Sequence, residues 1–217
     1  MNVPALHHMI GQLFIIGFKG DNINENHPIC RDIKEFDLGG VILFDRHLAT
    51  KSPSNNITGH SQLAKLTTKL QNLSSTKLFI AVDQEGGRVN RFRKEFGFKL
   101  TSSAAELGRS SDTELTRKSA KQTAEMLKSC GINFNLAPVV DLNSNINNPI
   151  VGKVERSFSS NSSTVYQHAS TWIAEHRKVG IGSCIKHFPG HGSSKDDSHL
   201  GFVEITDSWH ETELDPY

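Results

Sequence analysis

The stretch KLFIAVDQEGGRVNR, residues 77–91, joins a short apolar run to a polar, glycine-rich loop. The apolar part lacks strict alternation of apolar and polar side chains, which is typical of a strand buried on both faces of a parallel sheet. Asp83 closes the run, and Arg91 ends the loop that follows it. Because ligands of parallel α/β folds bind beyond the carboxyl ends of the strands, this junction is a candidate binding site.

Four more apolar runs of this kind are found along the chain, at residues 12–18, 39–44, 132–142 and 180–188. Apolar residues at helical spacing predict helices between the runs, over residues 61–73, 112–129 and 165–179. The alternation of strands and helices predicts an α/β fold with a parallel sheet and right-handed crossovers.

Local signals indicate where one of these helices begins and ends. Ser111 stands three residues before Glu114, and this spacing predicts a capping box. Gly131 follows the same helix and predicts its C-terminal stop. The connection between Asp83 and this helix is long, so we expect it to be functional or to carry small elements of its own.

The composition excludes several classes of protein. Hydrophobic residues make up 36% and charged residues 22% of the 217 residues, which predicts a soluble globule. A net charge of +1 gives no electrostatic reason to expect nucleic acid or an anionic membrane as partner. The N-terminus lacks the pattern of a signal peptide, and no apolar run approaches the ~18 residues of a membrane helix, so we expect a cytoplasmic protein. The three widely spaced cysteines, Cys30, Cys130 and Cys184, predict buried free thiols.

The stretch KHFPGHGSSKDDSH, residues 186–199, is predicted to be a loop because Pro189 lacks a backbone N–H and the glycines disfavour a helix. Asp197 and His199 are two residues apart, so in extended chain their side chains face the same side. The carboxylate could then hold one ring nitrogen and leave the other for proton transfer, for which a histidine pKa near ~6.5 is suited. A solvated loop without function is the alternative, and the residues alone leave both open.

A metal site in the same loop is a weaker alternative. His187 and His191 are four residues apart, but Pro189 and Gly190 forbid the helix that would place both rings on one face. Three cations near predicted strand ends, Arg91, Arg156 and Lys186, together with Asp83 instead suit a ligand that is rich in hydroxyl groups or carries an anion.

Four motifs together resemble the β-N-acetylglucosaminidases of glycoside hydrolase family three, in the bacterial branch that recycles the cell wall. They are AVDQEGGRVNRF (81–92), NFNLAPVVDL (133–142), ERSF (155–158) and the stretch 186–199. The resemblance implies a TIM-type (β/α)8 barrel, of which this chain would supply about the first five βα units. Residues 1–217 would then be the N-terminal portion of a single catalytic domain, whose remaining C-terminal part is expected elsewhere in the protein or on another chain.

The resemblance also implies an activity and a set of site residues. The activity is removal of terminal N-acetylglucosamine from β-linked glycans or muropeptides, with retention of configuration and without a metal or cofactor. His199 would be the general acid/base, with Asp197 as its partner. The residues implied in sugar binding are Asp83, Arg91, Arg156, Lys186 and His187.

The nucleophile is the one role that this sequence leaves unassigned. The family's nucleophile is an Asp after a later barrel strand, whereas Asp207 and Asp215 follow no predicted strand. We therefore expect residues 1–217 to be inactive on their own. Two other functions stay open: a catalytically inactive sugar-binding module, and a metal-dependent hydrolase on the same barrel.

Overall fold

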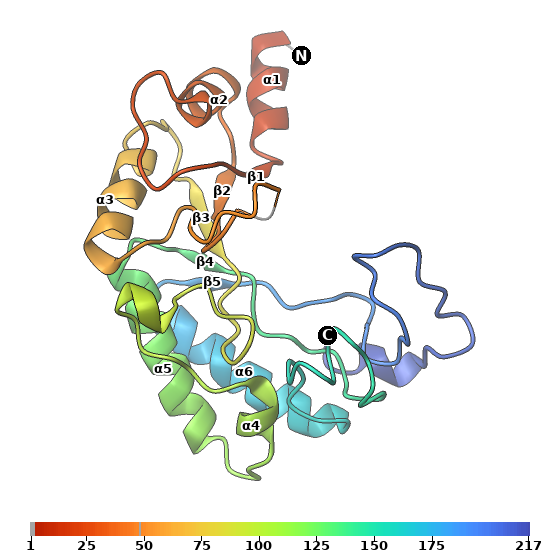
Figure 1. Cartoon of the computed structure of the whole chain (residues 1–217). Helices are drawn as coiled ribbons and strands as arrows, with labels where there is room; N and C mark the ends of the chain where they lie inside the picture. The colour runs from red at the N-terminus through yellow and green to blue at the C-terminus, as the bar shows by residue number, and fades with distance from the viewer. Residues whose placement is uncertain (1–2, 48) are drawn as a thin grey trace. The chain divides into compact units, whose positions relative to one another are not determined.

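The computed structural model describes residues 3–47 and 49–217 (Figure 1). The helices are α1 (Val3–Gly11), α2 (Pro28–Phe36), α3 (His60–Gln71), α4 (Ala104–Gly108), α5 (Glu114–Ser129) and α6 (Ser162–Lys178), with the short 3-10 helices η1 (Lys94–Phe96) and η2 (Glu211–Leu214). The strands are β1 (Ile15–Gly17), β2 (Gly40–Leu43), β3 (Phe79–Val82), β4 (Phe134–Asn135) and β5 (Gly182–Ser183).

The chain forms two compact units. The first contains the chain up to Asp83 together with Arg91–Lys99 and Met126–Asn135. The second contains Gln84–Asn90, Leu100–Glu125 and Leu136–Tyr217.

The first unit is built on a parallel sheet whose strands lie side by side in chain order, from β1 to β4. The register pairs Ile16 with Val41, and Val41 in turn with Ile80. The side chains of Val41 and Ile80 are fully buried. Helix α3 adds Leu63, Leu66 and Leu70 to this core, as its apolar spacing predicted. The predicted parallel α/β pairing is therefore confirmed within this unit.

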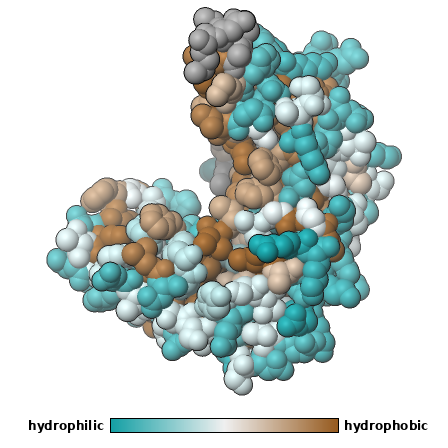
Figure 2. All heavy atoms as spheres, turned by 180° about the vertical axis from the view of Figure 1, so that it is seen from behind, coloured by the Kyte–Doolittle hydropathy of each residue, from teal (hydrophilic) through white to brown (hydrophobic). Residues whose placement is uncertain are grey.

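The strand β1 lies at the edge of the sheet and is more exposed than expected. Leu13 is 81% exposed and Phe14 is 52% exposed, and Ile15 is open to solvent as well. Figure 2 shows hydrophobic residues, in brown, reaching the surface on the face that it displays. The prediction that each strand is buried on both faces is wrong for β1 and for β5, whose residues are exposed or half-buried.

The core of the second unit forms between α4, the first part of α5, and α6. Ala120, Val165 and Trp172 are buried there, and the predicted stripes of α5 and α6 supply them. Thr116 of α5 and His168 of α6 share a hydrogen bond of 2.7 Å, so the helix contact includes a buried polar pair. No helix within residues 3–47 and 49–217 has the length and apolar character needed to cross a membrane.

The helix signals are confirmed in part. Gly131 follows α5 with a φ of +75°, in the left-handed conformation expected of a C-terminal stop. The predicted cap by Ser111 is wrong, because the N–H of Glu114 donates to Oδ1 of Asp112 at 2.9 Å. The long connection before α5 carries η1 and α4, as expected.

The cysteines also differ from expectation at one position. Cys30 and Cys130 are buried free thiols, and burial raises the pKa of Cys130 to about 11. Cys184 is exposed, so the prediction of a buried thiol is wrong there. It lies directly after the short strand β5, whose own residues are exposed or half-buried.

Candidate active site

A cluster of carboxylates and arginines lies at the ends of β2 and β3 in the first unit. Asp83 directly follows β3, and Asp45 comes two residues after β2. Arg91 reaches both: Nη2 lies 3.6 Å from Oδ2 of Asp83, and Nη1 lies 3.7 Å from Oδ1 of Asp45. The guanidinium of Arg91 also lies 5.8 Å from the centre of the Phe44 ring. The structure thus brings the predicted residues Asp83 and Arg91 together.

Asp45 anchors this cluster and was not predicted as a site residue. Its side chain is 1% exposed, and Nε of Arg93 lies 3.1 Å from its Oδ2. Asp83 is the more accessible carboxylate, with 19% of its side chain exposed. A bound hydroxyl group could therefore contact Asp83 while Asp45 keeps Arg91 in place. The position of Asp45 shortly after an apolar run, like that of Asp83, was the signal that could have identified it.

A second cluster, in the second unit, surrounds the carboxylate of Glu85. Arg156 donates from Nε to Oε2 at 2.7 Å and from Nη2 to Oε1 at 2.8 Å. Nζ of Lys186 lies 2.6 Å from Oε1. Burial favours the protonated acid, but the hydrogen bond from Arg156 and the charge of Lys186 outweigh it, and the pKa of Glu85 is lowered. Two predicted sugar-binding cations therefore meet at an ionised residue that had no predicted role.

His187 is held between Arg156 and Asp141. Its Nδ1 lies 2.5 Å from Oδ2 of the fully buried Asp141, and Nη2 of Arg156 lies 3.0 Å from its Nε2. Since a guanidinium can only donate, Nε2 of His187 accepts and Nδ1 carries the proton that Asp141 accepts. Burial raises the pKa of Asp141, but hydrogen bonds from His187 and from the backbone N–H of His191 outweigh it and lower the pKa.

The base of the loop at 186–199 is fixed by buried polar side chains. Nδ2 of the buried Asn148 donates to the carbonyl of His191 at 2.7 Å and to Oγ of Ser194 at 3.0 Å. Oγ of Ser194 in turn contacts Nδ1 of His191 at 2.8 Å. The side chain of Asn145 donates to the carbonyl of Ser194 at 2.9 Å. These contacts fix the backbone from which the rest of the loop extends.

The predicted pair of Asp197 and His199 lies in the distal, exposed part of this loop. Oδ1 of Asp197 accepts from the backbone N–H of His199 at 2.8 Å and contacts its Nδ1 at 2.7 Å. The backbone hydrogen bond, followed by the ring contact, lowers the pKa of Asp197. Since 75% of the His199 side chain is exposed, the arrangement presents an oriented imidazole to solvent. It could donate and accept a proton at Nε2.

The predicted site residues therefore fall into three groups. Asp83 and Arg91 lie in the first unit; Arg156, Lys186 and His187 form the Glu85 cluster of the second unit; the third group is the Asp197–His199 pair. Asp141 and His187, which lie at the ends of the fourth and fifth apolar runs, are in contact in the second unit. The catalytic and sugar-binding roles of all these residues stay predictions.

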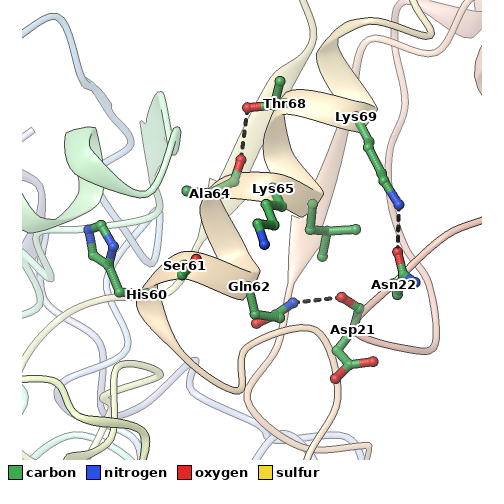
Figure 3. A pocket seen from close by; sticks show the side chains of 10 residues that line it. Asp21, Asn22, His60, Ser61, Gln62, Ala64, Lys65, Thr68 and Lys69 are labelled. Atoms are coloured by element: carbon green, nitrogen blue, oxygen red, sulfur yellow. Dashed lines mark hydrogen bonds between the residues drawn. The ribbon is translucent and has the colours of Figure 1, made fainter.

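A surface groove of about 910 Å³ runs beside α3 in the first unit (Figure 3). Nε2 of Gln62 donates to the carbonyl of Asp21 at 2.6 Å, and Nζ of Lys69 donates to Oδ1 of Asn22 at 2.8 Å. These groups already bind one another, and the predicted site residues are absent from the groove's lining. The groove is thus distinct from the clusters described above.

A parallel α/β scaffold with carboxylates and cations after its strands defines the class of protein: an α/β protein whose polar site is chemically suited to hydroxyl groups. The chain belongs to glycosyl hydrolase family 3, since the model of the family's N-terminal domain matches residues 5–217. That domain has a TIM-barrel-type fold, so the predicted fold class is confirmed.

Similar curated proteins are named beta-hexosaminidases. The chain is 38% identical over 181 residues to beta-hexosaminidase A of Pseudoalteromonas piscicida, covering 80% of this chain and 28% of the relative. It is 38% identical over 176 residues to a beta-hexosaminidase of Tolumonas auensis, covering 81% of this chain and 49% of the relative. The chain thus spans about half or less of the length of these relatives.

Solved structures agree with this relationship. A family 3 beta-N-acetylglucosaminidase from a Paenibacillus species superposes with a TM-score of 0.84 at 29% identity, covering 100% of this chain and 39% of the other. NagZ from Neisseria gonorrhoeae, solved in complex with N-trifluoroacetyl-D-glucosamine, has a TM-score of 0.75 at 31% identity, covering 87% of this chain and 53% of the other.

Proposed function

We propose that the whole protein to which this chain belongs is a retaining exo-β-N-acetylglucosaminidase. Its substrates would be muropeptides or related glycans with a terminal β-linked N-acetylglucosamine, and it would act in the cytoplasm in the recycling of peptidoglycan. Membership of family 3 and the named beta-hexosaminidases among the relatives support the activity. The complex of the gonococcal relative with an N-acylglucosamine supports the type of sugar.

The contact of 2.7 Å between His199 and Asp197 is the observation that carries the proposal. Asp197 accepts from Nδ1, which leaves Nε2 of His199 to protonate the glycosidic oxygen as the bond to the leaving group breaks. In the second step the same nitrogen takes a proton from the attacking water. A carboxylate nucleophile on the opposite face of the sugar completes this double displacement. By resemblance, that nucleophile follows a later barrel strand and is expected beyond residues 1–217.

Each of the two arginine-containing clusters, taken by itself, is suited to binding hydroxyl groups of a sugar. The exposed part of Asp83 would accept hydrogen bonds from ring hydroxyl groups, and Arg91, Arg156 and Lys186 would donate them. Charged partners make such hydrogen bonds stronger than neutral ones.

The proposal is tested by replacing Asp83 and measuring the binding of N-acetylglucosamine by calorimetric titration. Asp83→Ala removes an acceptor for the sugar and one of the two carboxylates beside Arg91. Losing one hydrogen bond to a charged group costs about 1.5–3 kcal/mol, so the affinity should fall roughly tenfold to a hundredfold.

Asp32→Ala is the matched control, because Asp32 also pairs with an arginine, Arg31, at 3.2 Å but lies on α2. It should leave the affinity unchanged. Equal affinities of the wild-type protein and Asp83→Ala would contradict the assignment of Asp83. A wild-type protein that binds no N-acetylglucosamine would contradict the proposed function.

A further inference from the structure

The motif EGGR, residues 85–88, has no role in the predicted chemistry, yet it builds a rigid support in the second unit. The N–H groups of Glu85 and Gly86 both donate to the carbonyl of Val89 at 3.1 Å, which closes a tight turn. Gly86 has a φ of +96°, and a Cβ atom there would lie 2.3 Å from the carbonyl oxygen of Ser102. Only glycine fits this close approach, so the turn fixes the backbone that carries Glu85.

The carboxylate of Glu85 is enclosed by the cations that it binds. Its side chain is 5% exposed, while those of Arg156 and Lys186 are 11% and 16% exposed. Arg156 is bound through two nitrogens, and its Nη1 also donates to the carbonyl of Ile150 at 2.8 Å. A bidentate pair of this kind fixes the plane of the guanidinium as well as its position. The orientation of Arg156, and through it that of His187, therefore depends on Glu85.

The cluster is balanced in charge. The positive charges of Arg156 and Lys186 are matched by the negative charges of Glu85 and Asp141. Both carboxylates have lowered pKa values and are ionised near neutrality. His187 adds no charge, because its Nε2 accepts from Arg156. An anionic ligand would thus meet no excess of positive charge here, whereas hydroxyl groups can still exchange hydrogen bonds with these side chains.

From these contacts we infer that Glu85 is a positioning residue, which orients Arg156 and Lys186 and cancels part of their charge so that the cluster takes an uncharged, hydroxyl-bearing sugar ring rather than an anion. The inference rests on the proposed function and adds to it the charge class of the ligand bound by this cluster.

Two substitutions separate the geometric part from the electrostatic part. Glu85→Gln keeps the shape but removes the charge, so Arg156 and Lys186 gain an excess of positive charge. Its affinity for N-acetylglucosamine should fall roughly tenfold to a hundredfold, and its affinity for inorganic sulfate should rise roughly tenfold. Glu85→Asp keeps the charge but shortens the side chain by one methylene, which moves the carboxylate away from Arg156 and Lys186. It should lose affinity for the sugar without gaining affinity for sulfate.

Both ligands are titrated calorimetrically with wild type, the two variants and the control Glu155→Gln. Glu155 also pairs with an arginine of this unit, Arg109 at 3.0 Å, but its side chain is 45% exposed. The control should match wild type with both ligands. An unchanged sulfate affinity in Glu85→Gln would overturn the electrostatic role, and an unchanged sugar affinity in both Glu85 variants would overturn the positioning role.

If the variants fail to fold, two measurements on the wild-type protein test the hydrogen-bond network around Glu85 and the charge balance of the cluster. Nitrogen NMR should find His187 protonated at Nδ1 and unprotonated at Nε2, and the opposite tautomer would overturn the network. Wild type should also bind sulfate at least tenfold more weakly than N-acetylglucosamine, and equal binding would overturn the charge balance. If wild type binds neither ligand, the proposed function fails, while the tautomer of His187 still tests the network around Glu85.

Discussion

The imidazole of His199 is oriented by a carboxylate two residues before it, on a part of the loop that is open to solvent. As a general acid, it matters most when the leaving group is a poor one. We predict that His199→Ala in the active enzyme slows cleavage of natural alkyl glycosides by about 10²–10⁴-fold. Activated aryl glycosides should be slowed much less, because an aryl oxide leaves without a proton. The rates of both substrate classes are compared in the same preparation.

The matched control for this prediction is His210→Ala. His210 is an exposed histidine before η2, and its side chain makes no capping hydrogen bond there. Its replacement should change neither rate. Equal slowing of alkyl and aryl substrates by His199→Ala would assign His199 to substrate binding or to structure instead.

A buried histidine of α6 links stability to pH. His176 is fully buried, stacks on Trp172 and contacts its carbonyl oxygen at 3.0 Å. Burial lowers the pKa of His176 to about 4, although the Trp172 carbonyl and the charge of Glu175 act in the opposite direction. The unfolded chain, with a pKa near ~6.5, therefore binds a proton over a pH range in which the folded protein does not.

We predict that the free energy of unfolding falls as the pH is lowered from about 6.5 towards 4. The loss from His176 should be on the order of 2–3 kcal/mol, since one pKa unit corresponds to ~1.4 kcal/mol. Urea unfolding at several pH values measures it. Carboxylates with lowered pKa values, such as Glu85 and Asp141, act in a lower range, because their stabilisation is lost only below the pKa of the unfolded chain, about 4.

His176→Gln should reduce the pH dependence in this range, and the buried His168, whose pKa is also lowered by burial, should account for the part that remains. His60→Gln, which removes an exposed histidine, should retain the wild-type slope. A slope in His176→Gln equal to that of the wild type would show that His176 is not responsible.

Residues at strand ends could be named from the sequence, but their partners could not. Asp83 and His187 were identified because an apolar run stops beside them, whereas Glu85 and Asp45 were not assigned a role. Which carboxylate meets which cation depends on distant parts of the chain: Glu85 and Arg156 are 71 residues apart. The spacing of apolar residues along the sequence does not indicate which carboxylate pairs with which cation.

At the scale of elements, the long amphipathic helices were predictable and the short ones were not. The segments 61–73, 112–129 and 165–179 correspond to α3, α5 and α6 within a few residues. Helix α2 was missed because it is short and is capped by His27, whose Nδ1 accepts from the N–H of Ile29 at 3.2 Å. Histidine is not among the preferred N-cap residues, so the usual N-cap signal is absent, although Pro28 stands at the first helical position.

The end of α5 gives a test of how closely it packs on α3. A Cβ atom at Gly131 would lie 2.3 Å from Oγ1 of Thr67, which donates to the carbonyl of Cys130 at 2.8 Å. Thr67 is buried and β-branched, so it cannot easily rotate away. Gly131→Ala should therefore lower the free energy of unfolding by about 1–2 kcal/mol, because alanine disfavours the left-handed conformation. The steric clash with Thr67 should lower it by at least ~1 kcal/mol more.

Gly97→Ala is the matched control for the steric part. Gly97 has a similar φ of +83°, but no atom lies within 4 Å of a Cβ built there. Urea unfolding of the two variants isolates the contact between α3 and α5 from the conformational cost. Equal losses of stability would contradict the tight approach at Thr67.

At the scale of the whole molecule, the exposed sheet edge at β1 and the unassigned nucleophile both raise the question of which further strands close the barrel. Exposed apolar side chains at an edge strand favour association with further chain segments. The family resemblance identified the type of fold from four short motifs, whereas the strand pattern alone indicated a parallel α/β sheet without showing whether it closes. Closure depends on strands that pair across the barrel, and residues 1–217 contain no sequence signal for them beyond the fifth apolar run.

The last prediction is that residues 1–217, expressed alone, do not turn over an aryl N-acetyl-β-glucosaminide. An aryl leaving group needs little acid assistance, so this substrate tests for the nucleophile rather than for His199. Within the described residues no strand follows β5; Asp207 lies in an exposed loop, and Asp215 lies at the exposed end of η2. Neither carboxylate is placed after a strand, where the family resemblance expects the nucleophile. Without that anion the oxocarbenium-like transition state lacks its principal stabilisation, and an intact acid/base pair cannot replace it. The assay uses the purified chain beside His199→Ala, Asp207→Asn and Asp215→Asn prepared in the same way, which reveals contaminating host enzyme as activity common to all four. Turnover that is present in the unchanged chain and abolished by Asp207→Asn or Asp215→Asn would place the nucleophile within these residues.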